Sequence, residues 1–335
     1  MIALFYALVA ATLIVYVVLD GFDFGAGALH LIVARTDEER RQVIGAIGPV
    51  WDANEVWLIA GAGLLFFAFP QAYAAGFSGF YLPLMLVLWL LVIRGLSIEL
   101  RSHLEDGLWR TFWDGALAFS SASMAVVLGA ALGNVLRGVP LDAEGSFMAP
   151  WFTNFRVHGE AGVLDWYTLL LGVFSLAALS AHGASYLCWR TEGVVRERSI
   201  RAARALWIAV AAGGLLCIAA TSLVRPSLYT ALLSRPWSWP MALLALVGLA
   251  GALRLHDRRG FLASAAFLAG TLGATAAGLF PVLLPSTIDA RYDVIAYTAA
   301  PGAHGLRVGL GWWAIGIPLA AAYTVYLYRN LRAGH

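Results

Sequence analysis

Four carboxylates in two apolar segments near the N-terminus are the side chains best placed to do chemistry. Asp20 and Asp23 follow a long uncharged run that begins at Ile2, and Asp52 and Glu55 stand in a second apolar run. Helix positions i and i+3 share a face, so each pair would project in one direction. An ionised carboxylate is costly inside a bilayer and normally faces a bundle interior, a hydrated path or a partner. We therefore interpret the four acids as a ladder that relays protons from the inner surface towards the middle of the membrane.

A second interpretation of the same acids is structural. Hydrogen-bonded acids also hold helices together, and the glycines next to Asp20 would allow two helices to approach closely. The block from Trp51 to Trp57, which contains Asp52, Asn54 and Glu55, places several polar or indole-bearing side chains within two helical turns. Each would need a partner in a dry interior. Trp51, Asn54 and Trp57 are therefore expected to have a structural or interface role beside the acids.

The composition places these residues in an integral membrane protein. Of the 335 residues, 61% are hydrophobic and 13% are charged, whereas charged residues make up about 25% of an ordinary soluble domain. Several apolar runs reach the ~20 residues that a membrane-spanning helix requires. All 22 basic residues are arginines and the net charge is +2, so no broad cationic face exists for nucleic acid.

The apolar runs predict an all-α membrane protein with about nine transmembrane helices in one domain, residues 1–335. The expected spans cover residues 2–31, 43–68, 72–96, 112–136, 162–187, 205–224, 238–254, 261–284 and 306–328. The seventh is short. Spans one to four and five to eight have the same orientations, which allows two four-helix bundles with a ninth, peripheral helix. No repeated motif marks such a duplication.

Arginines are concentrated in alternate connections. One set of connections and the C-terminal tail holds Arg35, Arg40, Arg41, Arg101, Arg110, Arg190, Arg196, Arg198, Arg201, Arg204, Arg258, Arg259, Arg329 and Arg332. The other set holds only Arg137, Arg156, Arg225, Arg235 and Arg291. Because arginine is enriched on the cytoplasmic side, this predicts an external N-terminus and a cytoplasmic C-terminus. The longest connections, roughly 137–161 and 285–305, would both be external.

The histidines argue against a haem-binding helix bundle. Such a bundle needs inward-facing histidine pairs at matched depths. His103, His158, His256, His304 and His335 fall in connections or the tail, His30 sits at the end of the first span, and only His182 lies well inside a span. His182 is interpreted as a hydrogen-bonded helix contact. Cys188 and Cys217 lack metal-site spacing, so we predict no metal or cofactor site in this chain alone.

Arg94, Glu99 and Asp114 are interpreted as interfacial residues, paired or snorkelling.

Several motifs in order resemble subunit II of the cytochrome bd quinol oxidases. They are Leu19-Asp20-Gly21-Phe22-Asp23-Phe24-Gly25, Pro49-Val50-Trp51-Asp52-Ala53-Asn54-Glu55-Val56-Trp57, Phe69-Pro70 with Ala72-Tyr73-Ala74, Phe77-Ser78-Gly79-Phe80-Tyr81, Arg94-Gly95, Gly133-Asn134-Val135-Leu136-Arg137-Gly138-Val139-Pro140, Thr191-Glu192-Gly193, and Phe280-Pro281 with Pro285-Ser286-Thr287. The likeness runs nearly end to end, although residues 137–161 do not match residue by residue.

The resemblance implies a multi-pass subunit of an oxidase in the bacterial inner membrane. A homologous subunit I would carry two b-type haems and haem d, oxidise quinol at the outer side and reduce oxygen to water. This chain would be its haem-free partner, with Asp52 on a hydrophilic path for cytoplasmic protons and Asp20 and Asp23 near a related entrance. Some members hold a structural quinone in this subunit, and a small single-helix accessory subunit is a further candidate partner. The alternative from another class is a proton-coupled transporter or carrier, which should show broken helices and a midplane site.

Overall fold

The computed structural model describes residues 1–157 and 159–330 and is built almost entirely from α-helices. The helices are α1 (Ile2–Val33), α2 (Asp37–Ile47), α3 (Trp51–Ala68), α4 (Pro70–Gly79), α5 (Tyr81–Leu100), α6 (Gly107–Arg137), α7 (Trp166–Arg190), α8 (Gly193–Val224), α9 (Pro226–Ser234), α10 (Trp239–Ala252), α11 (Arg258–Leu279), α12 (Ala296–Ala299) and α13 (Ala303–Asn330). Two single turns of 3-10 helix, η1 (Pro236–Ser238) and η2 (Ala290–Tyr292), and two short strands, β1 (Val282–Leu284) and β2 (Val294–Ile295), complete the described elements.

Seven of the described helices are long and apolar enough to cross a membrane: α1, α5, α6, α7, α8, α11 and α13. The pair α2 and α3, bent by 42° at residues 48–50, raises the number to eight if the pair forms one span. The shorter apolar segment Pro236–Ala252 is the predicted seventh span. Each of the nine expected ranges contains helix, which confirms an all-α membrane protein. Range 43–68 is divided between α2 and α3, range 72–96 is divided between α4 and α5, and range 261–284 ends beyond α11 in β1. Nine crossings and the orientation of the termini stay predictions.

Local sequence signals explain where the helices begin and end. Asp106, Asp165 and Asp257 each precede a helix and accept hydrogen bonds from its first free backbone N–H groups, which is what an N-cap side chain does. Pro70 and Pro226 occupy the first turn of α4 and α9, where a missing N–H is harmless. Thr36 opens α2 with a capping box closed by Glu39. The breaks between spans are thus encoded locally.

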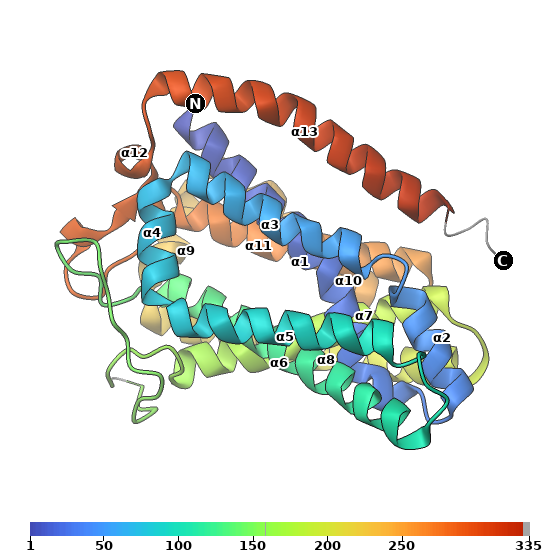
Figure 1. The fold of residues 1–335 in the computed structure, drawn as a ribbon. Coiled ribbons are helices and arrows are strands. Elements are labelled where there is room, and N and C mark those ends of the chain that lie inside the picture. The colour runs from blue at the N-terminus through green and yellow to red at the C-terminus, as the bar shows by residue number, and fades with distance from the viewer. Residues whose placement is uncertain (158, 331–335) are drawn as a thin grey trace.

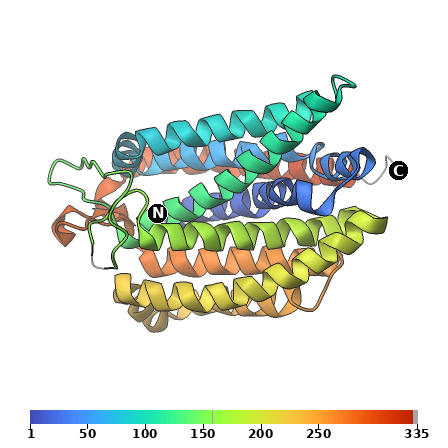
Figure 2. The same cartoon turned by 90° about the horizontal axis from the view of Figure 1, so that it is seen from below.

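The long helices lie roughly along one direction and form two adjoining groups (Figures 1 and 2). In the first group, α1 packs against α3 and α6, and α5 packs against α6. In the second, α7 packs against α8 and α11, and α10 packs against α11. Contacts of α7 with α1 and α6 join the groups. Helix α13 lies beside α3 at the edge of the molecule (Figure 1). This arrangement agrees with two four-helix groups and a peripheral ninth helix.

Helices α1 and α7 cross in backbone contact at the centre of the molecule. A Cβ atom on Gly25 would collide with the Leu179 carbonyl oxygen, and one on Gly183 would collide with the backbone of Gly25 and Ala26. Only glycine permits so close an approach, and small residues are the usual means of joining helices in lipid, where no hydrophobic force drives them together. The glycines that follow Asp20 and Asp23 therefore position α1 in the middle of both groups.

Loops gather at one end of the helices and short polar turns at the other. The N-terminus lies at the same end as residues 138–157, 159–165 and 282–302, which we call the loop end (Figure 1). The two long loops are joined there, because Val139 N–H donates to Pro285 O at 3.0 Å and Ser286 Oγ donates to Leu141 O at 2.7 Å. The other end carries α2 and the α5–α6 and α7–α8 turns, and we call it the α2 end. The predicted orientation makes the α2 end cytoplasmic.

Candidate functional site

Helix α1 buries both of its acids in the interior of the first helix group. Asp20 and Asp23 are separated by one helical turn and both side chains are fully inaccessible to solvent. Asp23 Oδ1 has no hydrogen-bond partner among the described residues, whereas the Tyr16 hydroxyl is a hydrogen-bond partner of the Asp20 side chain. The two acids thus share one face of α1 and lie inside the bundle, as the sequence predicts.

Arg94 of α5 is the cation that these acids face. Its Nη1 donates to Asp20 Oδ1 at 2.5 Å and its Nη2 donates to Glu55 Oε2 of α3 at 3.1 Å. The guanidinium carbon also lies 4.3 Å from the centre of the Phe24 ring. Arg94 is 1% exposed, so its interpretation as an interfacial residue is wrong. Sequence reasoning missed this role because nothing in α5 alone shows which residues of α1 and α3 it meets.

Asn54 and Tyr328 complete the surroundings of Asp23. The Asn54 amide donates to Asp23 Oδ2 at 2.8 Å and to Leu19 O at 3.2 Å. Tyr328 of α13 donates from its hydroxyl to Asn54 Oδ1 at 3.1 Å. Asp23 thus accepts a hydrogen bond from a neutral amide, whereas Asp20 accepts one from a cationic guanidinium. Two carboxylates, Asp20 and Glu55, thus share the Arg94 guanidinium, and Asp23 stands beside them.

Asp52 lies on a different face of α3 from Asn54. It is exposed, together with Val56 and Ile59, and makes no hydrogen bond or ion pair within the described part of the chain. Glu55, one turn further along α3, has a side chain 23% exposed and so stands between Asp52 and the buried cluster. The structure therefore brings together Asp20, Asp23 and Glu55, and places Asp52 next to them on the surface.

The two tryptophans of the α3 motif pack in different surroundings. The Trp51 ring covers Gly95, whose added Cβ would lie 3.0 Å from the ring. Its Nε1 donates to Glu99 Oε1 at 3.3 Å. Trp57 is buried in the main apolar core. Both fix the position of α3 against its neighbours, while Asn54 bonds to the acids directly.

A second charged cluster closes the α2 end. Asp114 of α6 is fully buried and accepts hydrogen bonds from Arg101 Nε at 2.6 Å and Arg40 Nη1 at 3.0 Å, and its Oδ1 lies 2.6 Å from His30 Nε2. Arg101 also donates to Asp37 at 2.7 Å. Asp114 is paired, as the sequence suggested, but it lies inside the protein. The sequence feature that could have pointed to this cluster is the spacing of His30, which stands seven residues after Asp23 and hence on the same face of α1.

Comparison with known proteins decides the family. The model of the family described as cytochrome bd terminal oxidase subunit II matches residues 1–331. The chain belongs to this family. It is similar to the cytochrome bd ubiquinol oxidase subunit 2 of Bacillus subtilis, with 32% identity over 309 residues, 91% of this chain and 88% of the relative. It is also similar to a probable cytochrome oxidase subunit 2 of Haemophilus influenzae, with 30% identity, 98% of this chain and 93% of the relative.

The fold agrees with a solved member of the same class. A chain in the structure of bd oxidase from Geobacillus thermodenitrificans superposes with a TM-score of 0.73, covering 100% of this chain and 99% of that one at 19% identity. The resemblance read from the motifs is therefore confirmed. The protein is a multi-pass bacterial membrane protein and a subunit of an oxidoreductase of the cytochrome bd class.

His182 is engaged as a helix contact, as expected for this subunit II chain. Its Nδ1 lies 2.6 Å from Ser264 Oγ and its Nε2 lies 2.9 Å from Val18 O. Both ring nitrogens are therefore occupied by hydrogen bonds, and neither is free to ligate iron. Within the described residues, no group of three or more His, Cys, Asp or Glu side chains is arranged to hold a metal ion.

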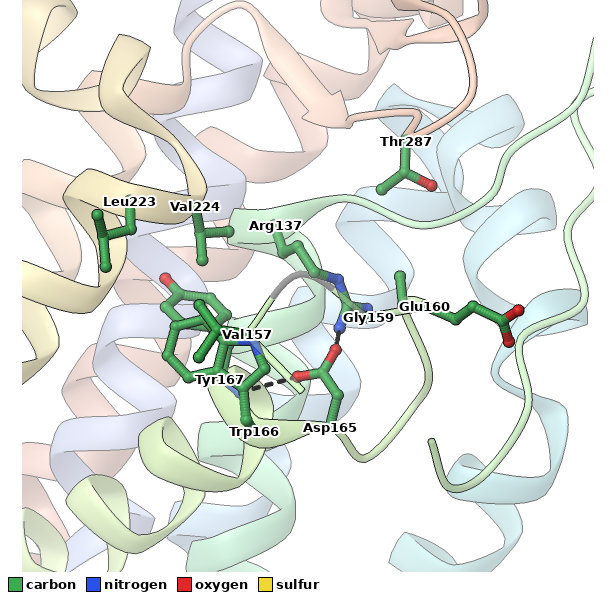
Figure 3. A pocket seen from close by; sticks show the side chains of 11 residues that line it. Arg137, Val157, Gly159, Glu160, Asp165, Trp166, Tyr167, Leu223, Val224 and Thr287 are labelled. Carbon is green, nitrogen blue, oxygen red and sulfur yellow. Dashed lines mark hydrogen bonds and ion pairs between the residues drawn. The ribbon is translucent and has the colours of Figure 1, made fainter. Parts of the chain in front are cut away.

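A cavity lies away from the acids, at the loop end. Its volume is ≈ 390 Å³, and Figure 3 shows Arg137, Asp165, Trp166, Tyr167 and Thr287 around it. Arg137 is an ion-pair partner of Asp165 and donates from Nη2 to Asn134 Oδ1 at 2.7 Å, so its guanidinium is occupied by protein groups. Nearby, burial lowers the pKa of Arg225. His158 lies outside the described residues.

Proposed function

We propose that this chain is the haem-free subunit of a quinol:O2 oxidoreductase, and that its acids deliver cytoplasmic protons across the contact with a haem-bearing subunit I. The observation that supports this most is the position of Asp52. It is an exposed carboxylate on α3, part of a predicted membrane span, and it stands one turn from Glu55, which bonds to the buried Arg94.

An exposed acid among apolar residues points to a covered surface. Asp52, Val56 and Ile59 form a stripe along α3, and the neighbouring α5 exposes Leu88 and Trp89. A carboxylate facing lipid tails would be costly, whereas one facing a partner or a hydrated gap would not. We infer that subunit I covers this stripe, and that Asp52 is the group that faces it.

The buried acids supply the inner part of the proposed route. Glu55 is partly exposed and bonds to Arg94, which bonds to Asp20, and Asp23 lies one turn from Asp20 on α1. Protons arriving from the α2 end would reach Asp23 and Asp20, pass to Glu55 and leave at Asp52 towards the oxygen-reducing haems. Arg94 keeps the excess of negative charge small enough for the cluster to stay buried.

The haems and the quinol site are expected in subunit I, which carries the electron transfer. Membrane lipid surrounds the remaining apolar surface, and a structural quinone and a single-helix accessory subunit stay expectations from the family. Membership of an oxidase family argues against the alternative of a proton-coupled transporter. The inner membrane, with the α2 end in the cytoplasm, is the proposed location.

Asp52→Asn tests the relay role directly. The amide keeps the shape of the side chain but carries no exchangeable acid proton. The purified complex should retain normal haem spectra and normal haem reduction by quinol, while steady-state oxygen consumption falls. Glu105→Gln is the control, because Glu105 is exposed in the α5–α6 turn and should leave turnover unchanged. Unchanged oxygen consumption in a fully assembled Asp52→Asn complex would refute the relay role.

A further inference from the structure

One face of α1 carries a row of polar positions that continues from the acids to the α2 end. Asp20, Asp23, Gly27 and His30 follow each other at intervals of three and four residues, which places them on a single helix face. Asp23 Oδ1 and His30 Nδ1 are both buried and both lack a hydrogen-bond partner among the described residues. Buried polar atoms are nearly always paired, with protein or with ordered water. Their alignment on one face therefore marks a site for water.

Ser121 of α6 fills the position that Gly27 leaves open. An added Cβ on Gly27 would collide with Ser121 Oγ and would lie 2.8 Å from Ser121 Cβ. The Ser121 hydroxyl is buried and has no partner among the described residues. Its neighbour Ser120 differs, because Ser120 Oγ donates to Ala116 O at 2.7 Å. The hydroxyl of Ser121 thus stands midway between His30 and Asp23 and is not used by its own helix.

The spacing along this row fits bridging by single waters. At ~1.5 Å per residue, Gly27 lies about 4.5 Å from His30 and about 6 Å from Asp23 along the axis of α1. Two hydrogen bonds through one water span roughly 5.5 Å. One or two waters between neighbouring groups would therefore connect His30, Ser121 and Asp23.

His30 is arranged to hold a proton at the start of this row. Its surroundings are the Asp114 carboxylate at 2.6 Å from Nε2, with Arg40 and Arg101 bound to the same carboxylate. The two arginines keep Asp114 an acceptor, so the neutral ring donates from Nε2 and leaves the Nδ1 lone pair free. Arg40 is one-quarter exposed, which brings the cluster to the surface of the α2 end.

We propose that His30 and Ser121 form the proton-uptake route that feeds Asp23 within this subunit. The inference rests on the proposed function of the acids. Nδ1 of His30 takes a proton from the one water that it faces, forming an imidazolium beside Asp114, and returns the proton to that water when the next water in the row has passed a proton inwards. The Ser121 hydroxyl accepts that proton on its oxygen and releases its own towards Asp23. Each group returns to its starting protonation, and one proton has moved inwards.

Ser121→Ala, with Ser120→Ala as the matched control, tests the route in the assembled complex. Proton uptake is followed with a pH-sensitive dye after the quinol-reduced enzyme meets oxygen, and haem oxidation is followed in the same sample. Ser121→Ala should slow proton uptake about tenfold, the factor of one lost hydrogen bond of ordinary strength, and leave haem reduction by quinol unchanged. Ser120→Ala should slow neither proton uptake nor haem reduction, because the Ser120 hydroxyl donates its hydrogen bond within its own helix.

His30→Gln supplies a second measurement of proton uptake in the assembled complex. The glutamine retains a donor for Asp114 but has no ring nitrogen that can take up a proton, so proton uptake should slow. If Asp23→Asn slows uptake but Ser121→Ala and His30→Gln do not, the acids relay protons and this route is wrong. If Asp23→Asn is also silent, the proposed function itself fails.

Discussion

Arg94→Gln is expected to destabilise the protein strongly, because it removes the cation shared by two acids. Arg94 is 1% exposed and lies 2.5 Å from Asp20, which is fully buried. Removing one partner of a buried ion pair costs about 3–5 kcal/mol, since the other charge stays buried without compensation. At roughly 2 °C per kcal/mol for a large chain, the apparent melting temperature of the purified complex should fall by about 6 °C or more.

Two further variants show whether the buried charge is the cause. Arg291→Gln breaks an ion pair with Asp289 of similar length, 2.8 Å, but Arg291 is 81% exposed, so water replaces the contact and the melting temperature should not change. Adding Asp20→Asn to Arg94→Gln removes the uncompensated charge and should restore most of the loss. The reasoning is refuted if Arg94→Gln shifts the melting temperature no more than Arg291→Gln, or if the double variant is additive.

Three further outcomes are expected. Gly25→Ala should lower the melting temperature or prevent assembly, because its Cβ would overlap the Leu179 carbonyl and overpacking costs at least about 1–3 kcal/mol. Gly115→Ala, which has open space around it, should leave both unchanged. Equal effects of the two substitutions would contradict the close crossing of α1 and α7. A reporter fused after His335 should be active only in the cytoplasm, whereas periplasmic activity would reverse the orientation. The chain expressed without subunit I should bind no haem; a b-type spectrum lost on His182→Ala would overturn that.

Much of the fold could be predicted because its signals are local. Each run of about 20 apolar residues and each capping aspartate or proline can be read without knowing the neighbours. The pairing of Asp20 and Asp23 on one face follows from helix geometry alone. The short seventh span and the bend between α2 and α3 were harder, because length and composition do not say whether a short helix or a bent pair crosses the membrane.

The direction in which a residue faces could not be predicted in the same way. Lipid and protein interior are both apolar, so an exposed and a buried face of a membrane helix have similar compositions. Asp52 and Asn54 stand two residues apart on α3, yet one is exposed and the other is buried against Asp23. Arg94 likewise looked interfacial from its position near a helix end. Its role depends on which helices surround α5, and that is a property of the tertiary fold.

Single-turnover proton uptake by Asp52→Asn tests the central claim most directly. The quinol-reduced complex is mixed with oxygen, and haem oxidation and proton uptake are recorded together in the unmodified and variant enzymes. If the acids of this subunit carry protons to subunit I, electron transfer among the haems will begin at its normal rate in Asp52→Asn while proton uptake from the medium is slowed. Proton uptake at the unmodified rate in the assembled variant would contradict the proposal and leave this subunit as a scaffold.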